Sequence, residues 1–182
     1  MFWLRRQLPV GRTATNLYGS IVTQVRQPYF YRVLGLPDTI NARYELLVMH
    51  LSIVLEALNL GGSVKDADRV RRALVEHFVA DMDDTMRELA VGDTSVPRKV
   101  KKLAAGLMDR SRDYASAFSG DSGPGASAAV LAEVFEHDQS SPIILRLSKY
   151  AHRLLQHVSH PEVAVALRSG QLTFPPFDLL AD

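Results

Sequence analysis

The sequence predicts an all-α protein, a single compact bundle of about six to seven helices. Three observations predict this fold class. Apolar residues recur at intervals of three and four along most of the chain. Prolines and glycines divide the 182 residues into helix-length pieces, and no stretch alternates apolar and polar residues as a strand does. A chain of this length buries a sufficient core without disulfides, and it contains no cysteine.

Four helices are predicted in the first two thirds of the chain, at about 13–27, 41–59, 65–89 and 95–118. Thr13 or Thr15 is expected to cap the first, which ends before Pro28. The second is apolar almost all round, which is typical of a central helix. Pro97 falls in the first turn of the fourth, where proline is tolerated. The stretch 28–40 is predicted to be a loop.

Three shorter features follow. Gly123-Pro124-Gly125 predicts a flexible connector over 121–126. A short helix is expected near 130–135, a longer one opens at Ser141-Pro142, and a last one runs from Pro161 to Gly170. The predicted organisation is a flexible or membrane-contacting segment at 1–12, a main helical domain at 13–120, the connector, and C-terminal helices at 127–182 that pack on the same domain.

Charge is unevenly distributed although the net charge is only +1, which argues against a polyanion binder that works by overall charge. Residues 1–37 hold five arginines and no acid, and residues 95–112 hold six basic residues against one acid. Acidic residues gather instead at 81–88. Separate basic and acidic regions suit electrostatic complementarity to a partner, although such runs are equally well explained as solvated helix faces.

Few residues offer reactive chemistry. His77, Asp81, Asp84 and Glu88 follow one helix face, but the paired Glu-x-x-His pattern of bundle di-metal proteins is absent. His50, inside the most apolar helix, is interpreted as a hydrogen-bonded core residue. No nucleophile–base arrangement and no Gly-rich phosphate loop is found. We therefore predict no catalytic, cofactor or metal site and no small-molecule substrate.

Two segments could contact anionic surfaces. A candidate basic patch, suited to phosphate in RNA or in acidic lipid, consists of Arg98, Lys99, Lys101 and Lys102; a solvated helix face is the alternative. Met1–Arg6 could rest on a membrane or be a disordered terminus.

No secretory signal is visible, and the most apolar run, Leu46–Leu58, is too short to span a bilayer. We expect a cytoplasmic protein that could be peripheral to the inner membrane.

Two stretches carry a family resemblance. Tyr29–Leu51, YFYRVLGLPDTINARYELLVMHL, contains an aromatic pair, a Gly-x-Pro-Asp-Thr turn, an aromatic–carboxylate pair and a His in an apolar helix. Phe78–Lys102, FVADMDDTMRELAVGDTSVPRKVKK, adds Asp-Met-Asp, Arg-Glu, Val-Gly-Asp and a basic run. In this order and spacing they resemble the ubiquinol–cytochrome c chaperone family. Family members often have Gly before Arg43, where this chain has Ala, and Ala90 replaces a larger apolar residue.

The resemblance implies a non-enzymatic chaperone, an assembly factor for the ubiquinol–cytochrome c reductase complex (complex III), acting on cytochrome b or an early complex III intermediate. It also implies contact with the ribosome or the inner-membrane surface, and no cofactor. Without a transit peptide, the chain is similar to the bacterial members. The alternatives are a carboxylate-metal-binding helical enzyme and a peripheral membrane or RNA-binding module.

The candidate partner-binding surface joins the 29–40 loop to the acidic end of the third helix. Its residues are Tyr31, Pro37, Asp38, Asp81, Asp83, Asp84, Arg87, Glu88, Gly92 and Asp93. Equally, Asp38 and Asp93 could serve only as helix caps, and Gly92 could only supply a positive φ.

Overall fold

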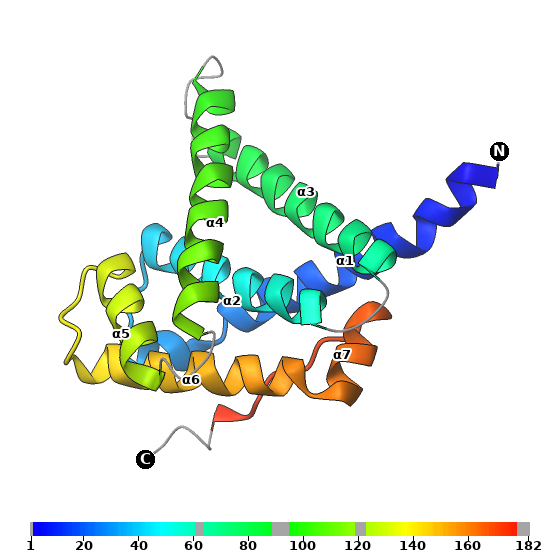
Figure 1. Ribbon diagram of the computed structural model, residues 1–182. Helices are drawn as coiled ribbons and strands as arrows, with labels where there is room; N and C mark the ends of the chain where they lie inside the picture. The colour runs from blue at the N-terminus through cyan, green and yellow to red at the C-terminus, as the bar shows by residue number, and fades with distance from the viewer. Residues whose placement is uncertain (1, 61–63, 89–94, 119–122, 178–182) are drawn as a thin grey trace.

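The structure is a computed structural model that describes residues 2–60, 64–88, 95–118 and 123–177. In these residues the chain forms seven α-helices and no strand (Figure 1), which confirms the predicted fold class. The helices are α1 (Phe2–Val25), α2 (Ile40–Leu60), α3 (Val64–Glu88), α4 (Val96–Phe118), α5 (Gly123–Val134), α6 (Pro142–Ser159) and α7 (Pro161–Arg168), and a π-helical turn, η1 (Tyr29–Val33), lies between α1 and α2.

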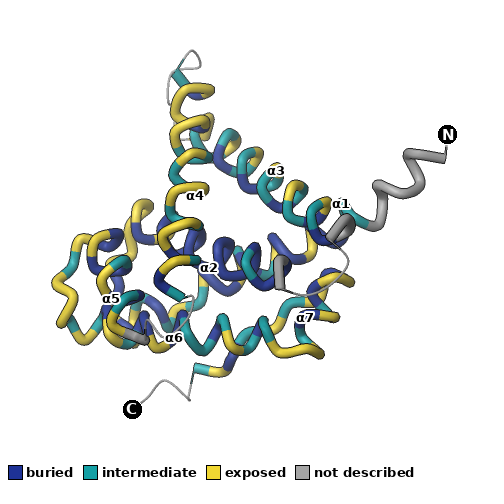
Figure 2. The backbone as a smooth tube through the Cα atoms, viewed as in Figure 1, coloured by how far each residue is buried: buried dark blue, intermediate teal, exposed yellow. Residues whose placement is uncertain are grey.

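Helix α2 is the centre of the molecule. Every residue from Glu45 to Leu55 is buried, and α1, α3, α4, α6 and α7 all pack against this helix. Figure 2 shows α2 as a buried segment surrounded by helices whose outer faces are exposed. A helix without a polar face has to be covered in this way, so the sequence prediction of a central helix is confirmed.

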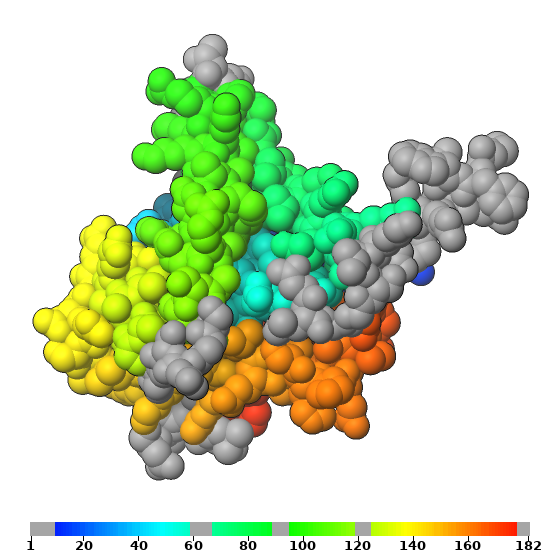
Figure 3. Space-filling model, viewed as in Figure 1, coloured from blue at the N-terminus to red at the C-terminus, as the bar shows by residue number. Residues whose placement is uncertain are grey.

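The surrounding helices each bury one stripe of apolar residues. On α3 the buried stripe includes Val70, Leu74, Phe78 and Met82, spaced by four. Helix α1 packs along α3, α4 packs on α2 and α3, and α5 packs on α4 and α6. The last turns of α3 and the first turns of α4 stand out from the body (Figures 1 and 3). The C-terminal end of α3 and the N-terminal end of α4 therefore project together on this side.

Two helices begin earlier than predicted. Helix α1 starts at Phe2 rather than after Thr13 or Thr15. The hydroxyl of Thr15 donates to the carbonyl oxygen of Gly11 at 2.9 Å, which is a bond within a helix and not a cap. Helix α5 starts at Gly123, so the Gly-Pro-Gly sequence predicted to be a connector forms its first turn, where proline costs no intrahelical hydrogen bond.

The predicted loop at 28–40 contains the π-helical turn. The N–H of Leu34 donates to the carbonyl of Tyr29 at 2.9 Å, and the N–H of Leu36 donates to that of Phe30 at 3.0 Å. Between them Gly35 has a φ of +93°, a conformation that strains any other residue. The turn places Phe30, Leu34 and Leu36 in the core and so anchors the connection that leads into α2.

Candidate docking groove

An apolar groove of about 560 Å³ opens where the C-terminal ends of α1 and α3 meet the N-terminal parts of α2 and α4. Its apolar lining consists of Val22, Val25, Ile40, Leu47, Met82, Met86 and Leu103. Val25, Leu47 and Met82 are buried, whereas Ile40 at the edge is 64% exposed. Methionine adapts its shape to different apolar partners, so the groove offers an adjustable apolar surface.

Arg43 fixes one edge of the groove. Its Nε donates to Oδ1 of Asp38 at 2.6 Å and its Nη2 donates to Oδ2 at 3.1 Å. The guanidinium lies 5.1 Å from the ring centroid of Tyr31, whose hydroxyl donates to the carbonyl of Val25 at 2.8 Å. Arg43 holds the pKa of Asp38 below its usual range. Two predicted partner-binding residues therefore already have partners within the chain, and Pro37 lies exposed beside them.

Asp81 ties α3 to α1. The hydroxyl of Tyr18 donates to Oδ2 of Asp81 at 2.7 Å, and burial beside this carboxylate raises the pKa of Tyr18, so the hydroxyl stays protonated. His77 lies on the same face, with Nε2 at 3.0 Å from the Thr15 hydroxyl and its ring stacked on Tyr18. In the part of the chain that the structure describes, no group of three or more His, Asp or Glu residues could hold a metal ion.

The acidic end of α3 continues from the groove toward the projecting turns. Arg87 donates through Nε to Oδ2 of Asp83 at 2.7 Å, four residues away, while Asp84 and Glu88 are exposed. Gly92 and Asp93 lie outside the described residues, so their predicted role stays a prediction. The acidic residues that remain open to a partner are thus next to Met86 along the same helix.

His50 lies in the core, as predicted, and not in the groove. Its Nδ1 is 2.7 Å from the carbonyl of Leu46 and its Nε2 is 2.7 Å from the hydroxyl of Tyr150, which also accepts from Nε2 of Gln24 at 3.1 Å. A carbonyl only accepts, so Nδ1 carries the proton and Tyr150 donates to Nε2. Burial lowers the pKa of His50 to about 4, so the ring is neutral.

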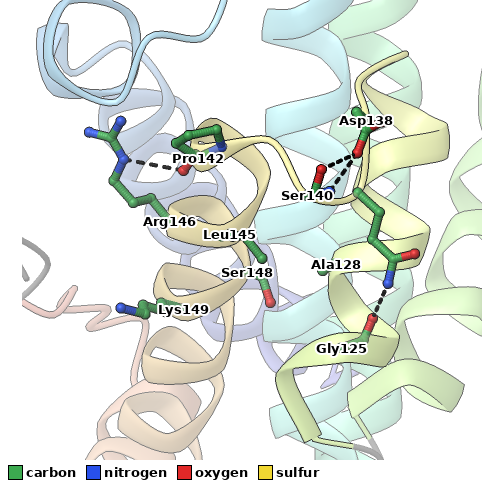
Figure 4. Close-up of a pocket in the computed structure, with 10 residues that line it drawn as sticks. Gly125, Ala128, Asp138, Ser140, Pro142, Leu145, Arg146, Ser148 and Lys149 are labelled. Atoms are coloured by element: carbon green, nitrogen blue, oxygen red, sulfur yellow. Dashed lines mark hydrogen bonds between the residues drawn. The ribbon is translucent and has the colours of Figure 1, made fainter.

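A second hollow, of about 990 Å³, lies between α5 and α6 (Figure 4). Asp138 accepts from the backbone N–H of Ser140 at 2.7 Å and from its hydroxyl at 2.6 Å. Arg146 donates through Nε to the carbonyl of Pro142 at 3.2 Å. These polar groups stabilise the turn before α6 and the start of that helix, so they explain the local structure without a ligand.

The basic patch is on the outer face of α4. Arg98, Lys99, Lys101 and Lys102 are exposed, whereas Val96 and Val100 on the opposite face are buried. The four cations form no ion pair with the residues that the structure describes. Among those same residues, no helix has the length and apolar character needed to cross a membrane.

The comparisons with known proteins identify the family. Residues 32–174 match the family model described as Ubiquinol-cytochrome C chaperone. The chain belongs to this family. Its fold is also similar to that in the crystal structure of the Cbp3 homolog from Brucella abortus, with a TM-score of 0.83 and 26% sequence identity over 97% of this chain and 96% of that chain. No curated protein matches the chain.

The two stretches that carry the family resemblance converge on the groove. Tyr29–Leu51 supplies its α2 side and Phe78–Lys102 supplies its α3 side. Sequence reasoning named Asp81 at this place but missed Arg26 and the apolar residues. Those apolar residues belong to ordinary helical stripes, and periodicity alone does not separate a stripe that is fully covered from one that is left partly open.

Proposed function

We propose that this member of the ubiquinol–cytochrome c chaperone family is a non-enzymatic assembly factor of complex III that holds cytochrome b, and that the groove is where it binds. The observation that carries this proposal is the convergence of both family stretches on one apolar groove. Cytochrome b is the partner that the resemblance implies. A chaperone needs an adaptable docking surface rather than a reactive centre, and the methionines of α3 supply one.

The groove suits an apolar segment of a partner. Burying apolar surface stabilises a complex by roughly 25 cal/mol per Å², and Met82 and Met86 can repack around side chains of different shape. Asp84 and Glu88, exposed just beyond Met86, add negative charge that favours a partner with basic residues near its apolar segment. Binding is therefore expected to depend on both apolar contact and charge.

Met86→Glu tests the groove directly. A buried charge in the groove is expected to weaken capture of cytochrome b, made in a cell-free system, by at least about tenfold. Val165→Glu is the matched control, because Val165 is 61% exposed on α7 and does not line the groove. Circular dichroism melts establish that both variants fold. Equal capture by wild type and Met86→Glu would contradict the proposed binding site.

The acidic residues are tested separately by Asp83→Lys with Asp84→Lys. We expect weaker capture and an unchanged fold, because both side chains lie at the surface of α3.

In the native host, deletion of the gene is expected to deplete assembled cytochrome b while its transcript stays intact. Normal cytochrome b levels in the deletion strain would refute the function itself.

The basic patch favours a second, compatible role at the inner-membrane surface. Exposed Lys and Arg residues near an anionic bilayer each contribute about 1 kcal/mol to binding, and this chain presents four of them on one helix face. Binding to phosphatidylglycerol vesicles is expected to fall steeply with salt and to be lost in Lys101→Glu with Lys102→Glu. Binding that is insensitive to salt would contradict this role.

A further inference from the structure

One charged residue of the groove has no partner among the described residues. Three charged residues line it: Arg26, Arg43 and Asp81. Asp38 pairs with Arg43 and Tyr18 donates to Asp81. Arg26, just beyond the end of α1, is exposed and has no side-chain hydrogen bond or ion pair with the residues that the structure describes. The α1 side of the groove therefore carries uncompensated positive charge.

The apolar walls have the spacing of helix ridges. On α1, Val22 and Val25 are three residues apart, and on α3, Met82 and Met86 are four residues apart. Residues at this spacing form ridges, and the groove between two such ridges accepts the ridge of a third helix. The exposed Ile40 leaves the edge open, which suits a helix laid into the groove more than a small molecule enclosed by it.

We infer that the groove binds an amphipathic helix of the partner, with apolar side chains at intervals of three and four between α1 and α3 and a carboxylate at one end that pairs with Arg26. This inference rests on the proposed function and adds the chemistry of the bound segment. Arg26 favours a carboxylate on the side of the bound helix that faces α1, whereas Asp84 and Glu88, exposed on α3, favour basic residues on the side that faces α3.

Two synthetic peptides test the inference. Both have about 18 residues, long enough to form a helix, and the same Ala-Leu stripe; one carries Glu and the other Lys at the end of the stripe. Fluorescence anisotropy with the full chain is expected to show about fivefold tighter binding of the Glu peptide. Arg26→Glu is expected to reverse the preference. Arg12→Glu is the control: it makes the same charge change at an exposed position of α1 outside the groove. This variant should leave the preference for the Glu peptide unchanged.

Three results would overturn the inference. The first is equal affinity of the wild type for both peptides, and the second is a preference that Arg26→Glu does not reverse. The third is concentration-dependent dimerisation that Met86→Glu abolishes, because the groove would then belong to a second copy of the chain. If neither peptide binds while cytochrome b is still captured through Met86, the inference fails and the proposed function stands.

Discussion

Helix α2 passes through two regions of opposite character. Around His50 it is enclosed by aromatic rings, and Phe30 lies 5.6 Å from the His50 ring and 5.1 Å from the Tyr150 ring, centroid to centroid. Around Ile40 the same helix borders an open groove. In the first region His50, Phe30 and Tyr150 are fully buried and the polar groups of His50 and Tyr150 are hydrogen-bonded, whereas the second region leaves apolar side chains uncovered. One continuous helix thus stabilises the fold at one place and lines an adaptable surface at another.

The largest expected effect is the loss of packing in the enclosed region. Phe30 is fully buried and its ring contacts those of His50, Tyr150 and Phe177. Phe30→Ala is expected to lower the free energy of unfolding by about 3–5 kcal/mol, because it creates a cavity. Urea unfolding measures this, with Val165→Ala as the exposed control, for which we expect a change within about 0.5 kcal/mol. Equal effects of the two changes would contradict the expected dependence of stability on the packing of Phe30.

The next effect is the pH dependence of the enclosed region. The pKa of His50 is about 4 in the folded protein and 6.5 as its reference value. The unfolded chain therefore binds the proton more readily, and stability falls as the pH is lowered from 6.5 toward 4. The total loss is about 3 kcal/mol, and stability is independent of this group above that window. His50→Asn should have a shallower slope; identical slopes would show that the ring is not neutral in the fold.

A smaller effect is expected from one hydroxyl in the same region. Tyr150→Phe removes the donor to His50 and the acceptor of Gln24 while the ring remains. The unsatisfied buried groups are expected to cost about 1–3 kcal/mol in unfolding free energy. Tyr31→Phe is the control, since its hydroxyl lies in a half-buried position at the open region. Tyr150→Phe is expected to lower the free energy of unfolding more than Tyr31→Phe does, and urea unfolding measures both; equal losses would contradict the special role of the enclosed hydroxyl.

The smallest effect on stability is expected at the edge of the groove. Ile40 is 64% exposed, so Ile40→Ser should change the free energy of unfolding by no more than about 0.5 kcal/mol. The same change removes apolar surface that a bound segment would cover, so capture of cytochrome b should weaken. Stability is measured by urea unfolding and capture by pull-down. A large loss of stability with normal capture would place Ile40 in the core of the fold instead.

Sequence reasoning succeeded where a residue's neighbours along the chain determine its environment. The strongly apolar character of 46–58 predicted the burial of α2, and it also predicted that His50 would be a hydrogen-bonded core residue. The predicted starts of α1 and α5 were wrong. Thr15 and Gly123-Pro124-Gly125 have the composition of a cap and a connector, but both lie within helices.

The groove could not be predicted because its residues come from four helices. Val22 and Leu103 are far apart in the sequence, and each belongs to a stripe with ordinary periodicity. The pairing of Arg43 with Asp38 could not be predicted from the sequence either, because it depends on how the segment before α2 places Asp38 relative to the first turns of that helix. Family resemblance indicated the right segments without showing that they face each other.

The bond between Gln24 and Tyr150 joins residues that are 126 positions apart. During synthesis, α1 through α4 leave the ribosome before α6 does, so all four helices that line the groove are exposed while the ring cluster that supports α2 still lacks Tyr150 and Phe177. We expect this protein to mature late and nearly all at once, after most of its length has been released. A nascent chain stopped before α6 should therefore be sensitive to protease, and it should become resistant once Tyr150 has emerged.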